Sequence, residues 1–284
     1  MARIRVVTDS ACDIPASIAD TLPLDVVSLT IRFGADEFVD RVDLSPAAFW
    51  SRCRTSRELP ETAAPSVGAF QEVYETAARE GYDGVIVLTI SAALSATHQS
   101  ATVAAQAVAE RIPVTVVDTQ AVSMAEGLVV IDVAERARDG ADLDTLVARA
   151  REIVPRAGVC GTLATLEHLK KGGRVGGAQA LLGQVLAIKP LLALRDGVVA
   201  EAGRQRTRAR ALAAVAEVAR SHAPLERIAV VHGDAADVGD LVALLEGVDV
   251  THPMVVTDIG PVVGTHGGPG IVAVCWVEAP RTGG

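Results

Sequence analysis

Short apolar runs alternate with helical segments through the first half of the chain, and this alternation restricts the possible folds more than any other feature. The apolar runs predict buried strands at residues 4–8, 26–31, 85–89 and 114–117. Helix patterns separate or follow these runs, and strands that alternate with helices form a parallel sheet covered on both faces. The sequence therefore predicts an α/β fold with a parallel sheet in its N-terminal part.

Turn and capping residues mark the segments between these strands. A turn at 33–36 leads into a further strand at 37–39, and a polar loop is expected at 54–65. Ser45 followed by Pro46 is typical of a helix start, and Ser66 is a second N-cap candidate. Further helices are predicted up to Ile18, from Ser66 to Gly81, up to Glu110, at 123–138 and at 142–154.

The second half of the chain shows a different pattern. Strands at 188–194 and 198–202 flank Asp196 and Gly197, which predict a type I′ hairpin turn. The remaining predicted elements are helices at 163–171, 178–186 and 209–219 and strands at 228–231, 254–257 and 271–277. Mixed hairpins and crossovers favour an α+β domain. We place the boundary near Pro155, which predicts a parallel-sheet N-terminal domain at 1–157 and an α+β C-terminal domain at 158–284.

Composition indicates a well-packed protein without a membrane span. Half of the 284 residues are hydrophobic, which excludes a disordered chain. The longest apolar stretch is interrupted by Gln184, Lys189 and Pro190, and no clean run of about 18 apolar residues exists. We therefore expect no transmembrane segment and at most transient contact with a membrane surface. No secretory signal is apparent, and the four cysteines fit neither a disulfide nor a zinc pattern. The predicted location is the cytoplasm.

Charge is unevenly distributed. The formal net charge of −9 argues against general affinity for nucleic acid. Residues 160–210 nevertheless carry nine Lys or Arg against three Asp or Glu, a local net charge of +6. Such a region is suited to an anionic group or an acidic partner surface, or it is a solvated helix face with a charged loop.

Hydroxyl-bearing residues follow the predicted strand at 85–89. Ser91, Ser95 and Thr97 lie where a helix begins, and a helix N-terminus presents unpaired N–H groups that favour a carboxylate or phosphate. Parallel sheets bind ligands at this end of their strands. Capping of the helix explains one of the serines but not the cluster, so an anion site with Ser95 is a candidate.

Three further segments carry candidate binding residues. Residues 60–66 present Thr62 between two prolines, and residues 172–177 enclose Arg174 between four glycines. The segment 260–270 is expected to be a turn-rich loop that holds His266 among glycines and prolines. The spacings of nucleotide-binding loops, metal sites and the nucleophile elbow are not met, so no cofactor and no metal are predicted.

Two other functions remain open on the residues alone. Ser95 as nucleophile with His266 as base would make an esterase-type hydrolase, although no third orienting residue is evident. The same helix N-terminus would also suit a module that binds a sugar phosphate or nucleotide phosphate.

Taken in order along the chain, these segments resemble the DegV family. The matching residues are 7–10, 62–66, 94–101, 117–119, Ser123 with Met124 and Gly127, 166–175, 188–190 and 264–270. The resemblance implies two domains with a long-chain fatty acid such as palmitate between them, its carboxylate bound by Thr62 and Ser95. Ala63 and Ala96 stand where the family usually has serine and glycine.

The resemblance also implies a role without catalysis of its own. Such a protein is the fatty-acid-binding subunit of a bacterial fatty-acid kinase and presents the carboxylate to a separate ATP-dependent protein, which forms an acyl phosphate. We expect Arg174, with Lys170 and Lys171, to contact this partner or the transferred phosphate. His266 is expected to stabilise the headgroup or the phosphorylated product.

Overall fold

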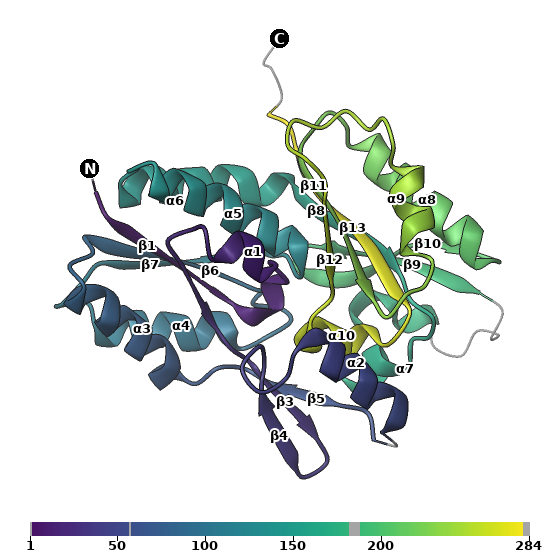
Figure 1. Cartoon of the computed structure of the whole chain (residues 1–284), viewed down its shortest axis with the longest axis horizontal. Coiled ribbons are helices and arrows are strands. Elements are labelled where there is room, and N and C mark those ends of the chain that lie inside the picture. The colour runs from purple at the N-terminus through teal and green to yellow at the C-terminus, as the bar shows by residue number, and fades with distance from the viewer. Residues whose placement is uncertain (1, 57, 182–187, 281–284) are drawn as a thin grey trace.

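The computed structural model describes residues 2–56, 58–181 and 188–280, and it is an α/β fold with two main sheets (Figure 1). The first sheet is parallel and has the strand order β2-β1-β6-β7. Its strands are β1 (Ile4–Asp9), β2 (Leu24–Val27), β6 (Gly84–Thr89) and β7 (Val114–Asp118). The predicted parallel sheet is therefore confirmed.

Helices cover both faces of this sheet, as its apolar strands require. Val85 and Val87 face a core shared with Phe70 and Tyr74, while Ile86 faces the opposite core. The helices on the two sides are α3 (Val67–Arg79) with α4 (Thr97–Ala107), and α5 (Met124–Arg138) with α6 (Leu143–Ile153). Ser66 accepts a hydrogen bond from the Ala69 amide at 3.1 Å and caps α3, as predicted.

A small antiparallel sheet, β4-β3-β5, corrects two predictions. The predicted strand 26–31 is two strands, because the chain leaves β2 at Val27 and enters β3 (Thr30–Phe33) in another sheet. Between them the Leu29 amide donates to Ser10 Oγ at 3.0 Å, which turns the chain. The predicted loop 54–65 contains β5 (Glu61–Ala63), which pairs with β3. Strand β4 spans Asp36–Val39, and helix α2 spans Pro46–Thr55.

The second main sheet has six strands in the order β10-β9-β8-β13-β11-β12. Its strands are β8 (Ala157–Thr162), β9 (Lys189–Arg195), β10 (Val198–Gln205), β11 (Leu225–Gly233), β12 (Val255–Asp258) and β13 (Ile271–Glu278). Asp196 and Gly197 both have positive φ, as the predicted type I′ turn between β9 and β10 requires. The domain boundary after residue 157 stays a prediction, and it falls just after the first residue of β8, the strand with which the six-stranded sheet begins.

Helices α8 (Arg208–Ser221) and α9 (Val238–Leu244) cover one face of the six-stranded sheet, and α5 packs against the other. The remaining short helices are η1 (Ser10–Cys12), α1 (Ala16–Ala19), η2 (Val154–Arg156), α7 (Glu167–Lys171) and η3 (Gly176–Leu181). Helix α7 is shorter than the predicted 163–171. The helix predicted at 178–186 lies partly in η3 and partly outside the described residues.

Helix α10 (Pro261–Gly267) occupies most of the segment predicted as a loop at 260–270. Its glycines serve close packing. A Cβ on Gly264 would lie 2.7 Å from the Phe49 ring and 2.8 Å from the Trp50 ring. Pro261 stands at the start of the helix, where it is tolerated. The loop prediction was wrong because glycine here permits close contact between helices rather than a turn.

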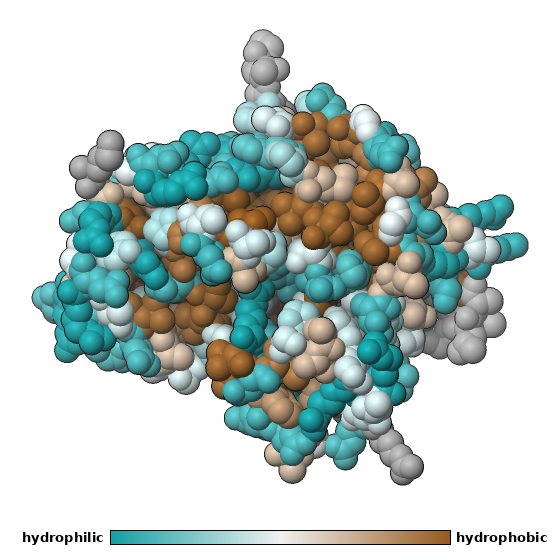
Figure 2. Space-filling model, viewed as in Figure 1, coloured by the Kyte–Doolittle hydropathy of each residue, from teal (hydrophilic) through white to brown (hydrophobic). Residues whose placement is uncertain are grey.

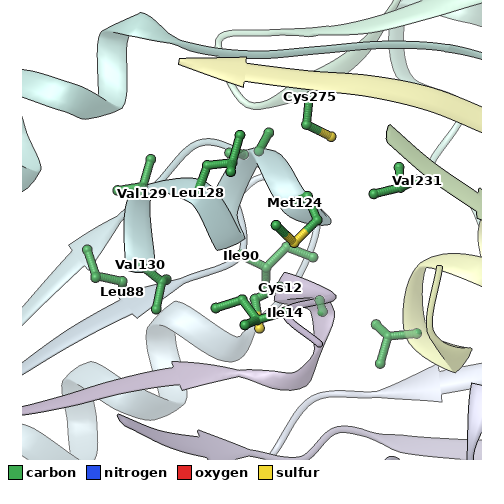
Figure 3. Close-up of a cluster of buried hydrophobic side chains, with 14 of the residues drawn as sticks. Cys12, Ile14, Leu88, Ile90, Met124, Leu128, Val129, Val130, Val231 and Cys275 are labelled. Carbon is green, nitrogen blue, oxygen red and sulfur yellow. The ribbon is translucent and has the colours of Figure 1, made fainter. Parts of the chain in front are cut away.

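Helix α5 joins the two main sheets. It is buried on nearly every side and contacts β1 and β6 of one sheet and β8, β11 and β13 of the other. Figure 3 shows Met124 of this helix beside Ile90 and Val130 beside Leu88, with Cys275 and Val231 of the second sheet on the far side of Met124. Every residue from Met124 to Ala134 is buried, including the charged side chains of Glu126 and Asp132, so this helix lies inside the protein.

The surface has both hydrophilic and apolar regions. In Figure 2, hydrophilic side chains cover α6, and hydrophobic side chains gather over the region of β11–β13. One of the exposed apolar residues in this part of the chain is Val256 on β12. Among the helices of the described residues, none has the length and apolar character needed to cross a bilayer.

Candidate functional site

A cavity of about 130 Å³ lies between the parallel sheet, the six-stranded sheet and helix α10. Its lining is mainly apolar: Leu29, Ile90, Leu94, Val122, Val159, Gly161, Leu163, Leu169, Leu192, Ala193, Leu194, Val199, Val231, Ile259, Val262, Val263, Gly267, Ile271 and Ala273. The polar residues of the lining are Thr62, Ser95, Ser123, Arg174 and His266. A concave apolar space with a few polar groups is typical of a small-molecule site.

Thr62 and His266 form a hydrogen-bonded pair on the cavity wall. Strand β5 carries Thr62, helix α10 carries His266, and Thr62 Oγ1 lies 3.0 Å from His266 Nε2. Gly172 packs against the other ring nitrogen so closely that a Cβ there would overlap Nδ1. His266 Nδ1 has no hydrogen-bond partner among the described residues. The glycines at 172 and 267 therefore make room for the imidazole and its helix.

Burial keeps the imidazole of His266 neutral. Burial, with a smaller contribution from the nearby positive charge of Arg174, lowers the pKa of His266 to about 4. A neutral imidazole has one N–H donor. We assign its proton to Nε2, because Nδ1 has no hydrogen-bond acceptor among the described residues. His266 then donates to Thr62 Oγ1, and the hydroxyl proton of Thr62 is available to an anion in the cavity.

Ser95 lies in the loop between β6 and α4. Its Oγ is 2.8 Å from Thr97 Oγ1, and it also accepts a hydrogen bond from the Thr97 amide at 3.3 Å. Ser95 therefore helps to cap α4, as the capping interpretation of the sequence predicts, and it lines the cavity as well. A group that Ser95 faces in the cavity is also close to the positive end of the α4 dipole.

Arg174 is held beside Ser95 by backbone carbonyls. Its Nε donates to Leu94 O at 3.2 Å and its Nη1 to Gly172 O at 2.6 Å. The guanidinium is thus fixed to the loop that carries Ser95 and to the segment that packs on His266. The structure brings the four predicted residues, Thr62, Ser95, Arg174 and His266, to one cavity. Lys170 and Lys171 do not line it, and Lys171 Nζ donates to Leu59 O at 2.9 Å.

Ser123 is a cavity residue to which the sequence assigned no role. It precedes α5 with φ 56° and ψ −147°, a backbone conformation that is nearly exclusive to glycine. Its Oγ donates to Asp13 Oδ2 at 2.5 Å, and Asp13 Oδ1 accepts from the Gly260 amide at 2.9 Å. Burial raises the pKa of Asp13 to about 7. This network connects the cavity wall to the start of α10.

A second hollow of about 510 Å³ adjoins the cavity. The two share Leu94, Ser95, Arg174 and Val199. Its other lining residues are Ala92, Ala93, Ala96, His98, Gln99, Gly173, Gly176 and Val198, several of which are exposed. The polar end of the cavity therefore adjoins a hollow that opens toward solvent.

Two other kinds of site, that of a hydrolase and that of a metal ion, can be compared with this geometry. A hydrolase would need His266 to activate Ser95, but the hydrogen bonds of His266 and Ser95 lead to Thr62 and Thr97 respectively. Within the described residues, no group of three or more His, Cys, Asp or Glu side chains is arranged to hold a metal ion.

Comparison with known proteins gives one consistent family. A family model described as an uncharacterised protein of the DegV family matches residues 3–279. A DegV domain-containing protein of Halalkalibacterium halodurans is 32% identical over 284 residues, which cover 97% of this chain and 99% of that protein. A solved structure that reports fatty acid binding of a DegV family protein from Thermus thermophilus is similar at TM-score 0.89 and 34% identity, covering 98% and 100% of the two chains. DegV of Bacillus subtilis, reported as a fatty acid binding protein, is similar at TM-score 0.89 and 27% identity, also covering 98% and 100%.

Proposed function

Because the chain belongs to the DegV family, we propose that it binds one long-chain fatty acid, such as palmitate, in the cavity between its two sheets. The observation that carries the proposal is the division of the cavity lining. Thr62 is hydrogen-bonded to His266, and Arg174 is bonded to the carbonyl of Leu94, the residue before Ser95. The rest of the lining is almost entirely apolar. An amphiphile with one anionic end matches this division.

The hydrocarbon tail supplies most of the binding free energy in this proposal. A chain of about 15 methylenes, at about 0.8 kcal/mol each, gives roughly 12 kcal/mol before ordering costs. A hydrogen bond to a carboxylate contributes on the order of 1.5 to 3 kcal/mol. The polar residues therefore fix the position of the carboxylate more than they determine affinity.

The carboxylate accepts hydrogen bonds from Thr62 and Ser95. His266 orients Thr62 by donating to its Oγ1, so that the threonine proton points to the ligand. The guanidinium of Arg174 and the start of α4 add positive potential at the same place. This arrangement favours the ionised acid over an ester or an alcohol.

The rest of the cavity favours an unsubstituted chain. Outside the headgroup residues, the only polar side chain of the described lining is Ser123, whose hydroxyl already donates to Asp13. A hydroxyl or second carboxyl on the chain would therefore be buried with no free partner, which costs several kcal/mol. We propose that the ligand is a simple saturated or unsaturated fatty acid.

We further propose that the protein presents this carboxylate to a separate ATP-dependent kinase, which forms the acyl phosphate. The second hollow supports this step, because it shares Ser95 and Arg174 with the cavity and gives an approach from solvent to the carboxylate. Phosphoryl transfer depends mainly on positioning and electrostatic stabilisation. Arg174 would stabilise the transferred phosphate or contact the partner, and this chain would perform no catalysis alone.

Lipid analysis of the purified protein tests the binding proposal. Denaturing extraction and mass spectrometry should recover about one fatty acid per chain. Protein that holds no lipid and takes up no added fatty acid would refute it. Hydrolysis of a chromogenic ester would favour the esterase alternative, and stabilisation by phosphates rather than by fatty acids would favour a phosphate-binding module.

Variants separate affinity from presentation. Thr62→Val and Ser95→Ala should weaken fatty-acid retention modestly but reduce acyl phosphate formation with the cognate kinase more strongly. Arg174→Ala should leave retention nearly unchanged and reduce the reaction. Ser221→Ala, an exposed serine on α8, is the control. If all the site variants retain lipid and react like the wild type, the assigned carboxylate site is wrong.

A further inference from the structure

We infer that Ala273, on the floor of the cavity, sets the length of acyl chain that the protein accepts. The inference rests on the proposed binding of a fatty acid, and it concerns strand β13 of the cavity floor rather than the headgroup residues. It is drawn from the register of the six-stranded sheet and from one close contact between strands.

One row of side chains crosses four strands of this sheet on its cavity face. Gly161 of β8 pairs with Leu192 of β9 and with Ala273 of β13, and Ala273 pairs with Val231 of β11. All four residues line the cavity. Strands lie about 4.8 Å apart, so the row forms a floor roughly 14 Å wide for the chain to cross.

The middle of the row is a depression. A Cβ on Gly161 would lie 2.6 Å from the Cβ of Ala273 and 2.7 Å from the backbone oxygen of Val272. Position 161 therefore excludes any larger residue unless the strands shift, and the two central positions together present a single methyl group. Leu192 and Val231 stand on either side and are larger.

Bulkier residues also lie before and after the depression along the strands. Side chains alternate between faces, so the neighbours of Ala273 on the cavity face are Ile271 and Cys275. Ile271 contacts Gly267, the residue after His266, so it is at the headgroup end. Ala273 is one row farther from the carboxylate site than Ile271.

Along β13 the cavity ends at Ala273, whereas on β8 it reaches Val159, the partner of Cys275. Cys275 is fully buried and does not line the cavity. Figure 3 shows Cys275 beside Met124 at the start of α5, and Met124 is also fully buried. The side chain at 273 therefore projects into the last open part of the cavity along β13. A larger residue there would shorten the space for the tail without touching the carboxylate residues.

Substitution of Ala273 by leucine tests the inference. The added carbons should displace about two methylenes of a long chain, and each buried methylene changes affinity about fourfold. Ala273→Leu should therefore bind stearic acid at least about tenfold more weakly than the wild type, and bind lauric acid nearly as well. Ala213→Leu makes the same change at an exposed position of α8 and should bind both acids like the wild type.

The measurement is the dissociation constant of delipidated full-length protein for lauric, palmitic and stearic acids, with thermal unfolding as the check on folding. If the leucine variant does not fold, Ala273→Val should show the same ranking with a smaller change. Unchanged relative affinities for the three acids in a folded variant would overturn the role of Ala273. A wild type that binds none of them would overturn the proposed function and this inference together.

Discussion

The backbone at Ser123 leads to a prediction that reverses an ordinary rule of protein stability. Alanine is usually more stabilising than glycine, because glycine loses more conformational freedom on folding. Ser123 has φ 56° and ψ −147°, where a Cβ is strained and glycine is not. We therefore expect Ser123→Gly to be more stable than Ser123→Ala.

The magnitude follows from three contributions. Both variants lose the hydrogen bond from Ser123 to the buried carboxyl group of Asp13, which costs about 1.5 to 3 kcal/mol. Only glycine relieves the backbone strain, which is worth about 1 to 3 kcal/mol. Glycine also loses more conformational entropy than alanine on folding, which lowers its stability by about 0.4 to 1 kcal/mol. The glycine variant should therefore exceed the alanine variant in free energy of unfolding by about 1 kcal/mol.

Urea unfolding of the two variants at equal lipid content measures this difference. Ser51 is the control, because it is an exposed residue within α2. Ser51→Gly should be less stable than Ser51→Ala by about 1 kcal/mol, the opposite order. If Ser123→Ala is as stable as Ser123→Gly, or more stable, the strain argument is wrong.

Two further predictions concern the cavity residues and the contact between the sheets. His266 has a pKa of about 4, whereas an unfolded histidine titrates near about 6.5. As pH falls through this window the unfolded chain binds the proton first, so the protein should lose up to roughly 3 kcal/mol of stability. The His266→Gln variant should lose less stability than the wild type between pH values near 7 and 5. Equal losses of the two proteins in urea unfolding would contradict this. Ser91 Oγ donates to Gly197 O at 2.8 Å, and Gly197 has φ +75° with no room for a Cβ. Ser91→Ala should lower the free energy of unfolding by about 1 kcal/mol, and Gly197→Ala should lower it by about twice as much. Equal shifts in the melting temperatures of the two variants would refute the steric argument.

Local signals predicted those elements whose ends carry capping or turn residues. Ser45 and Ser66 cap α2 and α3, and Asp196 with Gly197 forms the predicted hairpin turn. The failures are of another kind. The strand predicted at 26–31 belongs to two sheets, and β5 was predicted as loop, because only pairing with β3 makes it a strand. Pairing between distant segments leaves no periodicity in either of them.

Helix α10 shows that the structural role of a glycine cannot be predicted from its neighbours in the sequence alone. Residues 260–270 contain glycines and prolines that are typical of turns, and a loop was the natural prediction. The glycines at 264 and 267 instead lie where Phe49, Trp50 and Ile271 approach the helix. A glycine required for close packing and a glycine required for a turn look alike in one sequence.

Some residues of the candidate site could be predicted by physical reasoning, some only from the family resemblance, and some not at all. Ser95 follows from physical reasoning, because it lies in the loop between a buried parallel strand and the helix after it. No spacing relates Thr62, Arg174 and His266 to it, and only the family resemblance placed Thr62 and Ser95 on one carboxylate. Ser123 was unassigned because a serine in the sequence does not reveal its backbone conformation. The pairing of Gly161 with Ala273 was equally hidden, since 112 positions separate them and only the register of β8 against β13 brings them together. For this reason the headgroup is the part of such a site that sequence motifs can indicate, whereas the shape of the space for the tail depends on strand register and has to be read from the structure.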